Sequence, residues 1–209
     1  MTTSIAGQAV FVVTIGNLGR YVIIEAMDEK LSNSISAVLR GETKEFRYIV
    51  QEFEKRVFYY FLRMTRDYDE ARDLTQNTFI RAYRYIRSYD CSRSFSGWLF
   101  SIAHNQLKDL WARKSRDACS LEELEEKYFQ RFATDERVVE RLEEKNLQEK
   151  VRESVLALPE LYREVMLLLL IENSTYEEIS GITGLPLNTV KIRIHRARKL
   201  LKSVLEKWL

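Results

Sequence analysis

Two successive helical patterns between Asp69 and Arg113 limit what this chain can fold into. The first repeats apolar or small side chains at spacings of three and four, which buries one helix face: Ala71, Leu74, Thr75, Thr78, Phe79, Ala82, Tyr83 and Ile86. The second follows a serine N-cap, Ser94 or Ser96, and buries Trp98, Leu99, Ile102, Ala103, Leu107, Leu110 and Trp111. The whole chain of 209 residues has only seven glycines and two prolines. We therefore predict an all-α fold.

The segment between these two helices is Ser88–Gly97, which is polar, aromatic and weakly basic. An arginine-bearing aromatic loop held between two packed helices suits the binding of unpaired nucleic acid bases. The second helix adds a polar face of its own, with His104, Asn105, Lys108, Arg113 and Lys114.

A second recognisable pattern runs from Ser174 to Leu201. Ser174 or Thr175 can cap a first helix, because Glu177 and Glu178 are placed for a capping box. Gly184 supplies a tight turn, and a second helix is predicted to begin at Asn188 or Thr189. Its inward positions are Val190, Ile194, Ala197, Leu200 and Leu201, and its outward positions are Lys191, Arg193, His195, Arg196, Arg198 and Lys199. This pattern predicts a helix-turn-helix whose second helix enters a DNA groove.

The remaining helical patterns complete two small domains. They are a short helix over Leu31–Leu39, a long one over Phe46–Met64, a helix ending before Pro159, and a buried one over Glu160–Ile171. Residues 115–134 are acidic and lack a long apolar face, so they read as a linker or as a plain solvated tether. We expect domains at 27–114 and 135–209, joined by the acidic linker 115–134.

Residues 1–26 have a different character. Two β-branched runs, Ala9–Ile15 and Tyr21–Ile24, are split by Gly16–Gly19 in a hairpin-like pattern. They are too short to span a bilayer and lack the basic start of a signal peptide. Our hypothesis is that Met27 is the real start; the alternative is a regulatory hairpin, although an isolated hairpin is only marginally stable.

Charge, cysteine and histidine usage narrow the function. The formal net charge is only +2, but basic residues dominate from Lys191 onward, which implies a polyanionic partner. Cys91 and Cys119 show no ligand spacing, so we expect free thiols, no metal and no cofactor. His104 and His195 are interpreted as surface or groove-facing. Since no nucleophile–base pair or phosphate-binding glycine loop is present, an enzyme is not expected.

The two patterns resemble conserved regions of bacterial RNA polymerase sigma factors of the extracytoplasmic-function (ECF) class, in the sigma-70 superfamily. Asp73–Tyr83 (D-L-T-Q-N-T-F-I-R-A-Y) and Trp98–Asn105 (W-L-F-S-I-A-H-N) are similar to region 2. In that family the first of these helices docks on the polymerase clamp, and the second, with its preceding loop, opens the promoter. The helix-turn-helix resembles region 4, with Asn188 for a frequent glycine and Ile192 for a frequent serine. Leu169 and Leu170 stand where relatives often carry charge.

The resemblance implies three sets of site residues. The core-polymerase contacts would be Asp73, Gln76, Asn77, Phe79 and Tyr83, of which Phe79 and Tyr83 fit a buried helix face equally well. The −10 DNA contacts would be Tyr89, Asp90, Ser92, Arg93, Phe95, Asn105, Lys108, Arg113 and Lys114, with Tyr89 and Phe95 stacking on bases and Trp98 and Trp111 in the core. The −35 contacts would be Asn188, Thr189, Lys191, Ile192, Arg193, His195, Arg196, Arg198 and Lys199.

The implied function is that of a cytoplasmic specificity subunit. It would bind the clamp and flap of core RNA polymerase, duplex promoter DNA at −35 and single-stranded DNA at −10, without membrane insertion. An anti-sigma factor is a further partner by family resemblance. The alternative is a stand-alone helix-turn-helix activator, which explains residues 174–202 but leaves the Trp98–Asn105 helix and its loop without a role.

Overall fold

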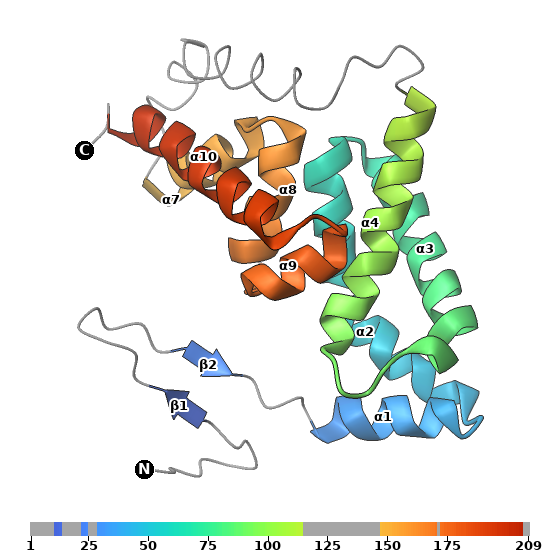
Figure 1. The fold of residues 1–209 in the computed structure, drawn as a ribbon. Helices are drawn as coiled ribbons and strands as arrows, with labels where there is room; N and C mark the ends of the chain where they lie inside the picture. The colour runs from blue at the N-terminus through green and yellow to red at the C-terminus, as the bar shows by residue number, and fades with distance from the viewer. Residues whose placement is uncertain (1–10, 14–21, 25–28, 115–146, 171, 207–209) are drawn as a thin grey trace. The chain divides into compact units, whose positions relative to one another are not determined.

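The computed structural model of the chain describes residues 11–13, 22–24, 29–114, 147–170 and 172–206 (Figure 1). By the density of its contacts the chain divides into two units, residues 1–54 and 55–209. The expected linker 115–134, Cys119 and the start of the expected C-terminal domain lie outside the described residues.

The first unit begins with a hairpin, as the sequence pattern indicates. Strand β1 (Phe11–Val13) pairs antiparallel with β2 (Val22–Ile24), with Val12 opposite Ile23. Helix α1 (Glu29–Leu39) follows and buries an apolar stripe that includes Leu31 and Ile35. The chain then passes through the short helix η1 (Thr43–Glu45) into α2 (Phe46–Thr65), which crosses into the second unit.

A left-handed glycine ends α1. Gly41 has φ +101°, a conformation that residues with a Cβ rarely adopt. Its N–H donates to the Val38 carbonyl at 2.9 Å, and the N–H of Glu42 donates to the Ala37 carbonyl at 3.0 Å. The last carbonyls of the helix are thus satisfied by the turn that follows it.

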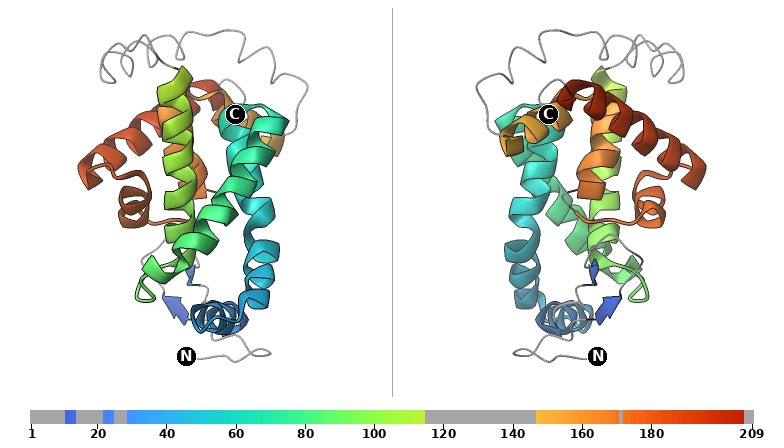
Figure 2. Two further views of the ribbon diagram at one scale, coloured as in Figure 1. Left: turned by 90° about the vertical axis from the view of Figure 1, so that its right-hand side faces the viewer. Right: turned by 90° about the vertical axis from the view of Figure 1, so that its left-hand side faces the viewer.

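The second unit is entirely helical in the part of the chain that the structure describes. After α2 come α3 (Tyr68–Tyr85), η2 (Ile86–Ser88) and α4 (Phe95–Lys114), then α7 (Leu147–Ala157), α8 (Glu160–Leu170), α9 (Tyr176–Thr183) and α10 (Leu187–Leu205). Helix α3 packs beside α4, and α4 also packs against α9 (Figure 2). The predicted all-α class is confirmed, apart from the N-terminal hairpin.

Helices α3 and α4 are joined by an apolar face and one buried polar pair. Helix α3 starts at the N-cap Asp67, whose carboxylate accepts from the Glu70 N–H at 2.9 Å. Its buried side includes Leu74, Thr78 and Phe79. Gln106 of α4 donates to the Thr78 hydroxyl at 2.5 Å, so this buried amide is satisfied across the helix pair.

The helix-turn-helix forms as its sequence predicts. Thr175 caps α9 through a reciprocal capping box with Glu178, at 3.1 and 2.8 Å. Gly184 takes a left-handed conformation at φ 70° and supplies the turn. Helix α10 begins at Leu187 behind Pro186, one or two residues before the predicted start. It packs against α7, α8 and α9.

Candidate nucleic-acid interface

The predicted clamp-binding face on α3 is open to solvent, with one exception. Asp73, Gln76 and Asn77 are exposed, and Tyr83 is 42% exposed. Phe79 is only 7% exposed and belongs to the buried side of α3. A contact between Phe79 and a partner therefore conflicts with the structure, because its ring is already covered within the chain.

Two further apolar side chains of α3 are exposed, and one of them, Ile80, lies on this face. Ile80 is 48% exposed and Tyr85 is 60% exposed, which is high for large apolar residues on a packed helix. Neither residue was among the expected site residues. Spacing could have placed Ile80 on the polar side, since it follows Gln76 by four, but it puts Tyr85 three residues after the buried Ala82, so its exposure was not foreseeable from spacing.

The loop before α4 has an aromatic centre that is buried rather than open. Tyr89 is 6% exposed and Phe95 is 2% exposed. Their rings meet edge to face at 5.1 Å, and both contact Trp98. The Tyr89 hydroxyl donates to the Arg93 carbonyl at 2.6 Å, and burial raises the pKa of this phenol.

This burial corrects the expected role of Tyr89 and Phe95. Base stacking needs an open ring face, which neither residue offers in this conformation. The two rings instead fix the path of the loop between η2 and α4. The cause is local. The aromatic side chains of this short loop and of the start of α4 pack on one another, which leaves no ring face open for a base.

The polar residues of the same loop form a preorganised turn. Asp90 accepts from the Ser92 N–H at 3.0 Å and from the Ser92 hydroxyl at 2.8 Å. These hydrogen bonds hold the pKa of Asp90 below its usual range. Arg93 lies 3.4 Å from the same carboxylate and is exposed. Ser94 accepts from the Gly97 N–H at 3.2 Å, which confirms it as the cap of α4.

Beyond Phe95, three of the four expected DNA contacts on helix α4 are exposed to solvent. Asn105, Lys108 and Arg113 are exposed. The side chain of Lys114 lies outside the described residues. Trp98 and Trp111 are half-buried, which fits their interpretation as packing residues more than as open stacking platforms.

The position predicted for His104, on the same helix, was wrong. The sequence placed it on a surface or in a groove, but the structure buries it. Its Nδ1 lies 2.7 Å from Oε1 of Glu164, a buried carboxylate on α8. No local pattern around His104 reveals a partner 60 positions away.

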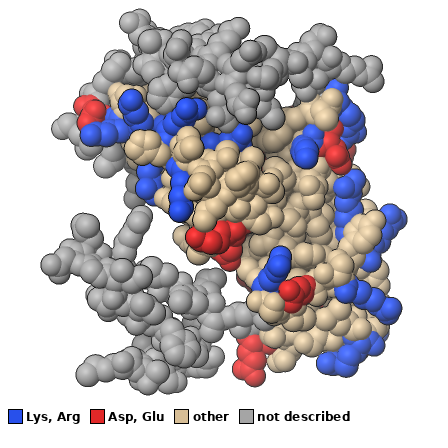
Figure 3. Space-filling view, in the orientation of Figure 1, with Lys and Arg blue, Asp and Glu red and all other residues tan. Residues whose placement is uncertain are grey.

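Basic side chains cover the outer face of α10, as Figure 3 shows by the blue side chains gathered over this helix. Exposed residues are Asn188, Lys191, Ile192, His195, Arg198 and Lys199, and half-buried ones are Thr189 and Arg196. Arg193 is 7% exposed, so its assignment as an outward DNA contact was wrong. It lies three residues after Val190 and four before Ala197, which places it on the buried side of the helix.

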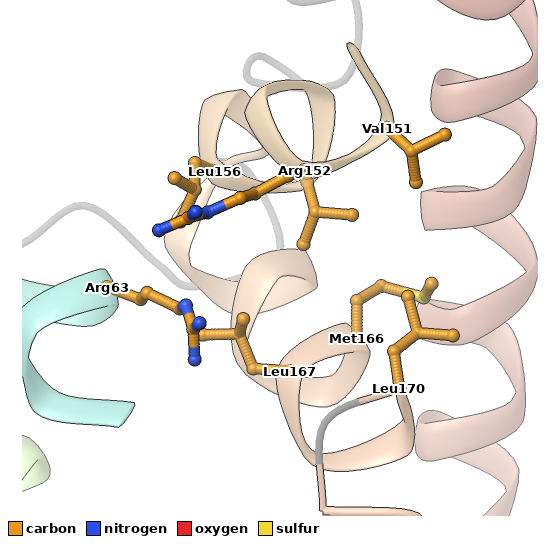
Figure 4. A pocket seen from close by; sticks show the side chains of 8 residues that line it. Arg63, Val151, Arg152, Leu156, Met166, Leu167 and Leu170 are labelled. Atoms are coloured by element: carbon orange, nitrogen blue, oxygen red, sulfur yellow. The ribbon is translucent and has the colours of Figure 1, made fainter. Parts of the chain in front are cut away.

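An apolar cavity of about 200 Å³ lies between α7 and α8, with one side chain from α2 at its edge (Figure 4). Arg63 and Arg152 approach it at one side, and Met166 and Leu170 line the other. Leu170 is 48% exposed. Burial, and next the charge of Arg152, lower the pKa of Arg63. Apart from the two arginines, every residue that lines the cavity is apolar.

Metal and membrane features are absent from the part of the chain that the structure describes. No group of three or more His, Cys, Asp or Glu side chains is placed to hold a metal ion there. Within the same residues, none of the helices combines the length and the apolar character needed to cross a membrane. Cys91 is an exposed free thiol.

Comparison with known protein families gives matches to two regions of the chain. Residues 49–117 match the family model of sigma-70 region 2, and residues 148–201 match that of sigma-70 region 4. The ECF RNA polymerase sigma factor SigW of Bacillus subtilis is 32% identical over 185 residues, which cover 86% of this chain and 98% of that protein. The chain belongs to the ECF RNA polymerase sigma factors.

Other members of the family are similarly related. The ECF sigma factor SigE of Mycolicibacterium smegmatis is 33% identical over 76% of this chain and 61% of that protein. The RNA polymerase sigma-H factor of Pseudomonas aeruginosa is 29% identical over 88% of this chain and 97% of that protein. The first of these relatives, SigW, is matched along nearly its whole length.

Two solved structures share the fold. RpoE of Bartonella quintana, solved in complex with the anti-sigma factor NepR, has a TM-score of 0.58 and 19% identity. The alignment covers 79% of this chain and 99% of RpoE. CnrH, in complex with the cytosolic domain of CnrY, has a TM-score of 0.58 and 22% identity, over 85% of this chain and 97% of CnrH.

Membership of this family defines the function of the chain. A sigma factor binds core RNA polymerase, recognises the −35 and −10 promoter elements and melts the promoter for initiation. A stand-alone activator is not favoured, because such a protein has no need of region 2. The sigma factors are initiation factors and not enzymes.

Proposed function

We propose that this sigma factor divides its work among three surfaces of the described chain. Asp73, Gln76, Asn77 and Tyr83 on α3 bind the polymerase clamp. The loop before α4 and the polar face of that helix take the −10 strand. The outer face of α10 reads the −35 duplex. The observation that carries this proposal is exposure, since the matching side chains on α3, α4 and α10 point to solvent.

At −10, polar groups hold the DNA strand. With the Tyr89 and Phe95 rings buried, an extruded base would meet the exposed turn of Asp90, Ser92 and Arg93 and the side chain of Asn105. Base flipping costs a few kcal/mol, which hydrogen bonds in such a turn can offset. Lys108, Arg113 and Lys114 then neutralise backbone phosphates. We therefore keep the polar and basic −10 contacts in the proposal and leave out stacking by Tyr89 and Phe95.

At −35, the start of α10 is the part that reads sequence. The N-terminal residues of a recognition helix contact base edges in the major groove, which assigns that role to Asn188, Lys191 and Ile192. Ile192 is 51% exposed and can contact a thymine methyl group. His195, Arg196, Arg198 and Lys199 lie further along the helix and contact phosphates.

Partners and location follow from the same role. The protein acts in the cytoplasm, where core polymerase and the chromosome are. An anti-sigma factor is a further partner, since RpoE, a sigma factor of the same fold, was solved in complex with the anti-sigma factor NepR. The apolar cavity between α7 and α8 is a candidate contact for the polymerase flap, because it offers an open apolar surface with two arginines at its edge.

A reconstituted transcription assay tests the proposal. Purified core polymerase with this chain should give defined run-off transcripts from genomic promoters, and core alone should give none. The matched control is the variant Asp73→Ala/Gln76→Ala, which should lose transcription while retaining its helical content. A chain that footprints duplex DNA without polymerase, and gives no transcripts with it, would contradict the proposal.

A further inference from the structure

The apolar cavity between α7 and α8 is built from side chains one helical turn apart. Val151 and Val155 lie four residues apart on α7, and Met166 and Leu170 lie four residues apart on α8, so each pair shares a helix face. Val155 and Met166 are 6% and 2% exposed, whereas Val151 and Leu170 are 37% and 48% exposed. The cavity therefore has a covered floor and a mouth that solvent reaches.

Two arginines lie at one side of this cavity. Arg63 comes from the last turn of α2 and Arg152 from α7, and Figure 4 shows both on the side opposite Met166 and Leu170. The guanidinium of Arg63 lies over the Tyr59 ring, with its central carbon 5.4 Å from the ring centroid. Within the described parts of the chain, neither Arg63 nor Arg152 forms an ion pair.

The two positive charges at the cavity act on each other. Burial, and next the charge of Arg152, lower the pKa of Arg63, against the opposing charges of Glu172 and Tyr59. An anion beside both guanidinium groups would offset this repulsion, because an opposite charge favours the charged form. Arginine binds carboxylate through charge-assisted hydrogen bonds, which are stronger than those between neutral groups. One side of the cavity thus favours an anion, and the rest favours hydrocarbon.

We propose that this cavity binds a free medium-chain fatty acid, with the hydrocarbon chain between α7 and α8 and the carboxylate at Arg63 and Arg152. A concave, mostly apolar surface with a few placed polar groups is the usual form of a small-molecule site. The volume of about 200 Å³ is below the roughly 300–1,000 Å³ of sites for drug-sized ligands, which limits the length of the chain.

The lining argues against other classes of small molecule. A nucleotide or a sugar carries many hydroxyl and amide groups, which need hydrogen-bond partners when they are buried. Only the two arginines among the lining residues offer such partners through their side chains. A cationic amphiphile would bring a third positive charge to the two already present, which is unfavourable.

A fatty acid in the cavity would occupy the surface that is the candidate contact for the polymerase flap. The two occupants would then exclude each other, so the ligand would reduce the affinity for core polymerase. This consequence rests on the proposed flap contact, whereas binding of the fatty acid to the free chain does not. The test is therefore made on the free chain first.

The test follows the methyl group of Met166 by NMR in the full chain. The chain has four methionines, so ¹³C labelling of their methyl groups gives four signals, and the variant Met166→Leu assigns the one from the cavity. Octanoate should shift this signal saturably and give nuclear Overhauser effects between the Met166 methyl group and the octanoate chain. Because each buried methylene strengthens binding by about fourfold, octanoate should bind roughly tenfold more tightly than hexanoate.

Head-group charge separates recognition of an anion from the filling of an apolar hole. Octylamine has the same chain and the opposite charge, and should bind at least about tenfold more weakly than octanoate. Arg152→Gln removes one charge from an exposed position and should weaken octanoate binding about tenfold, with the helical signal in circular dichroism retained. The matched control is Arg84→Gln, at an exposed position on α3, which should leave the affinity unchanged.

Four results would overturn the fatty acid site. They are equal affinity for octanoate and octylamine, equal affinity in Arg152→Gln and Arg84→Gln, a shift of all four methionine signals together, and no response of Met166 to octanoate. In the last case, a Met166 signal that moves with protein concentration alone assigns the cavity to a second copy of the chain. One that moves only with core polymerase assigns it to the flap. A chain that binds octanoate but gives no transcripts with core contradicts the proposed function and supports the site.

Discussion

The proposed clamp-binding face on α3 allows a binding residue to be distinguished from a packing residue by mutation. Asp73 and Gln76 lie on the exposed side of α3, and Phe79 lies one turn on with 7% of its surface exposed. The perturbation is the double change Asp73→Ala/Gln76→Ala, compared with Phe79→Ala on the same helix. The double variant should lose core binding and keep its stability, whereas Phe79→Ala should lose stability.

The magnitudes follow from the contacts each side chain makes. Asp73 forms one exposed ion pair with Arg72 at 3.8 Å, worth between 0 and about 1 kcal/mol. Alanine returns a few tenths of a kcal/mol through its higher helix propensity. The free energy of unfolding should therefore change by less than about 0.5 kcal/mol. Phe79→Ala empties a buried site and should cost about 3–5 kcal/mol.

Two assays are needed, one for stability and one for binding. Urea denaturation followed by circular dichroism gives the free energy of unfolding, and fluorescence anisotropy gives the dissociation constant for core polymerase. The double variant should keep its stability and bind core about tenfold or more weakly, a loss of about 1.4 kcal/mol. A loss of stability above about 1 kcal/mol, or unchanged core binding, would refute the assignment of this face.

Three further outcomes are expected. Arg198→Ala should weaken duplex binding evenly across sequences and lower the salt slope by about one phosphate, as titrations at several salt concentrations will show. Thr175→Ala removes the capping box of α9 and should cost about 1 kcal/mol of unfolding free energy in urea denaturation, with helical content retained. Burial raises the pKa of Glu172 against the opposing charges of Arg56 and Arg63. Its neutral form is therefore favoured when packed, and its contribution to stability is complete below the usual glutamate pKa and is lost as the pH rises through the raised one. Lowering the pH from about 7 to about 5 should thus stabilise the parent chain relative to Glu172→Gln; a parallel pH profile in both would contradict this.

Local signals account for the features that the sequence predicted well. The capping box of Thr175, the glycine turn at Gly184 and the Ser94 cap depend on neighbours within four residues, and all three form. The order of the helices follows from apolar spacing, which needs no knowledge of the partner helix. The two family motifs indicated the function and the surfaces expected to carry it. They gave no information on the buried contacts beneath those surfaces.

The corrections have different causes, and only that for His104 depends on a distant part of the chain. His104 is buried against Glu164 of α8, 60 positions away in the sequence, and Tyr89 and Phe95 are covered by the nearby Trp98. Arg193 could have been placed by spacing, since it shares the buried side of α10 with Val190 and Ala197. Its charge suggested an outward position instead, because α10 is rich in basic side chains.

The central claim is that −35 reading and −10 opening belong to different surfaces of this sigma factor. The most direct measurement is run-off transcription by the Lys191→Ala variant with core polymerase, on a duplex promoter and on the same promoter pre-melted at −10. Lys191 is exposed early in α10, where a good contact with guanine contributes about 1–3 kcal/mol. The account predicts reduced transcription and relaxed −35 preference on the duplex, with transcription from the pre-melted template unchanged. Equal loss on both templates would contradict the division of labour between α10 and the loop and polar face of α4.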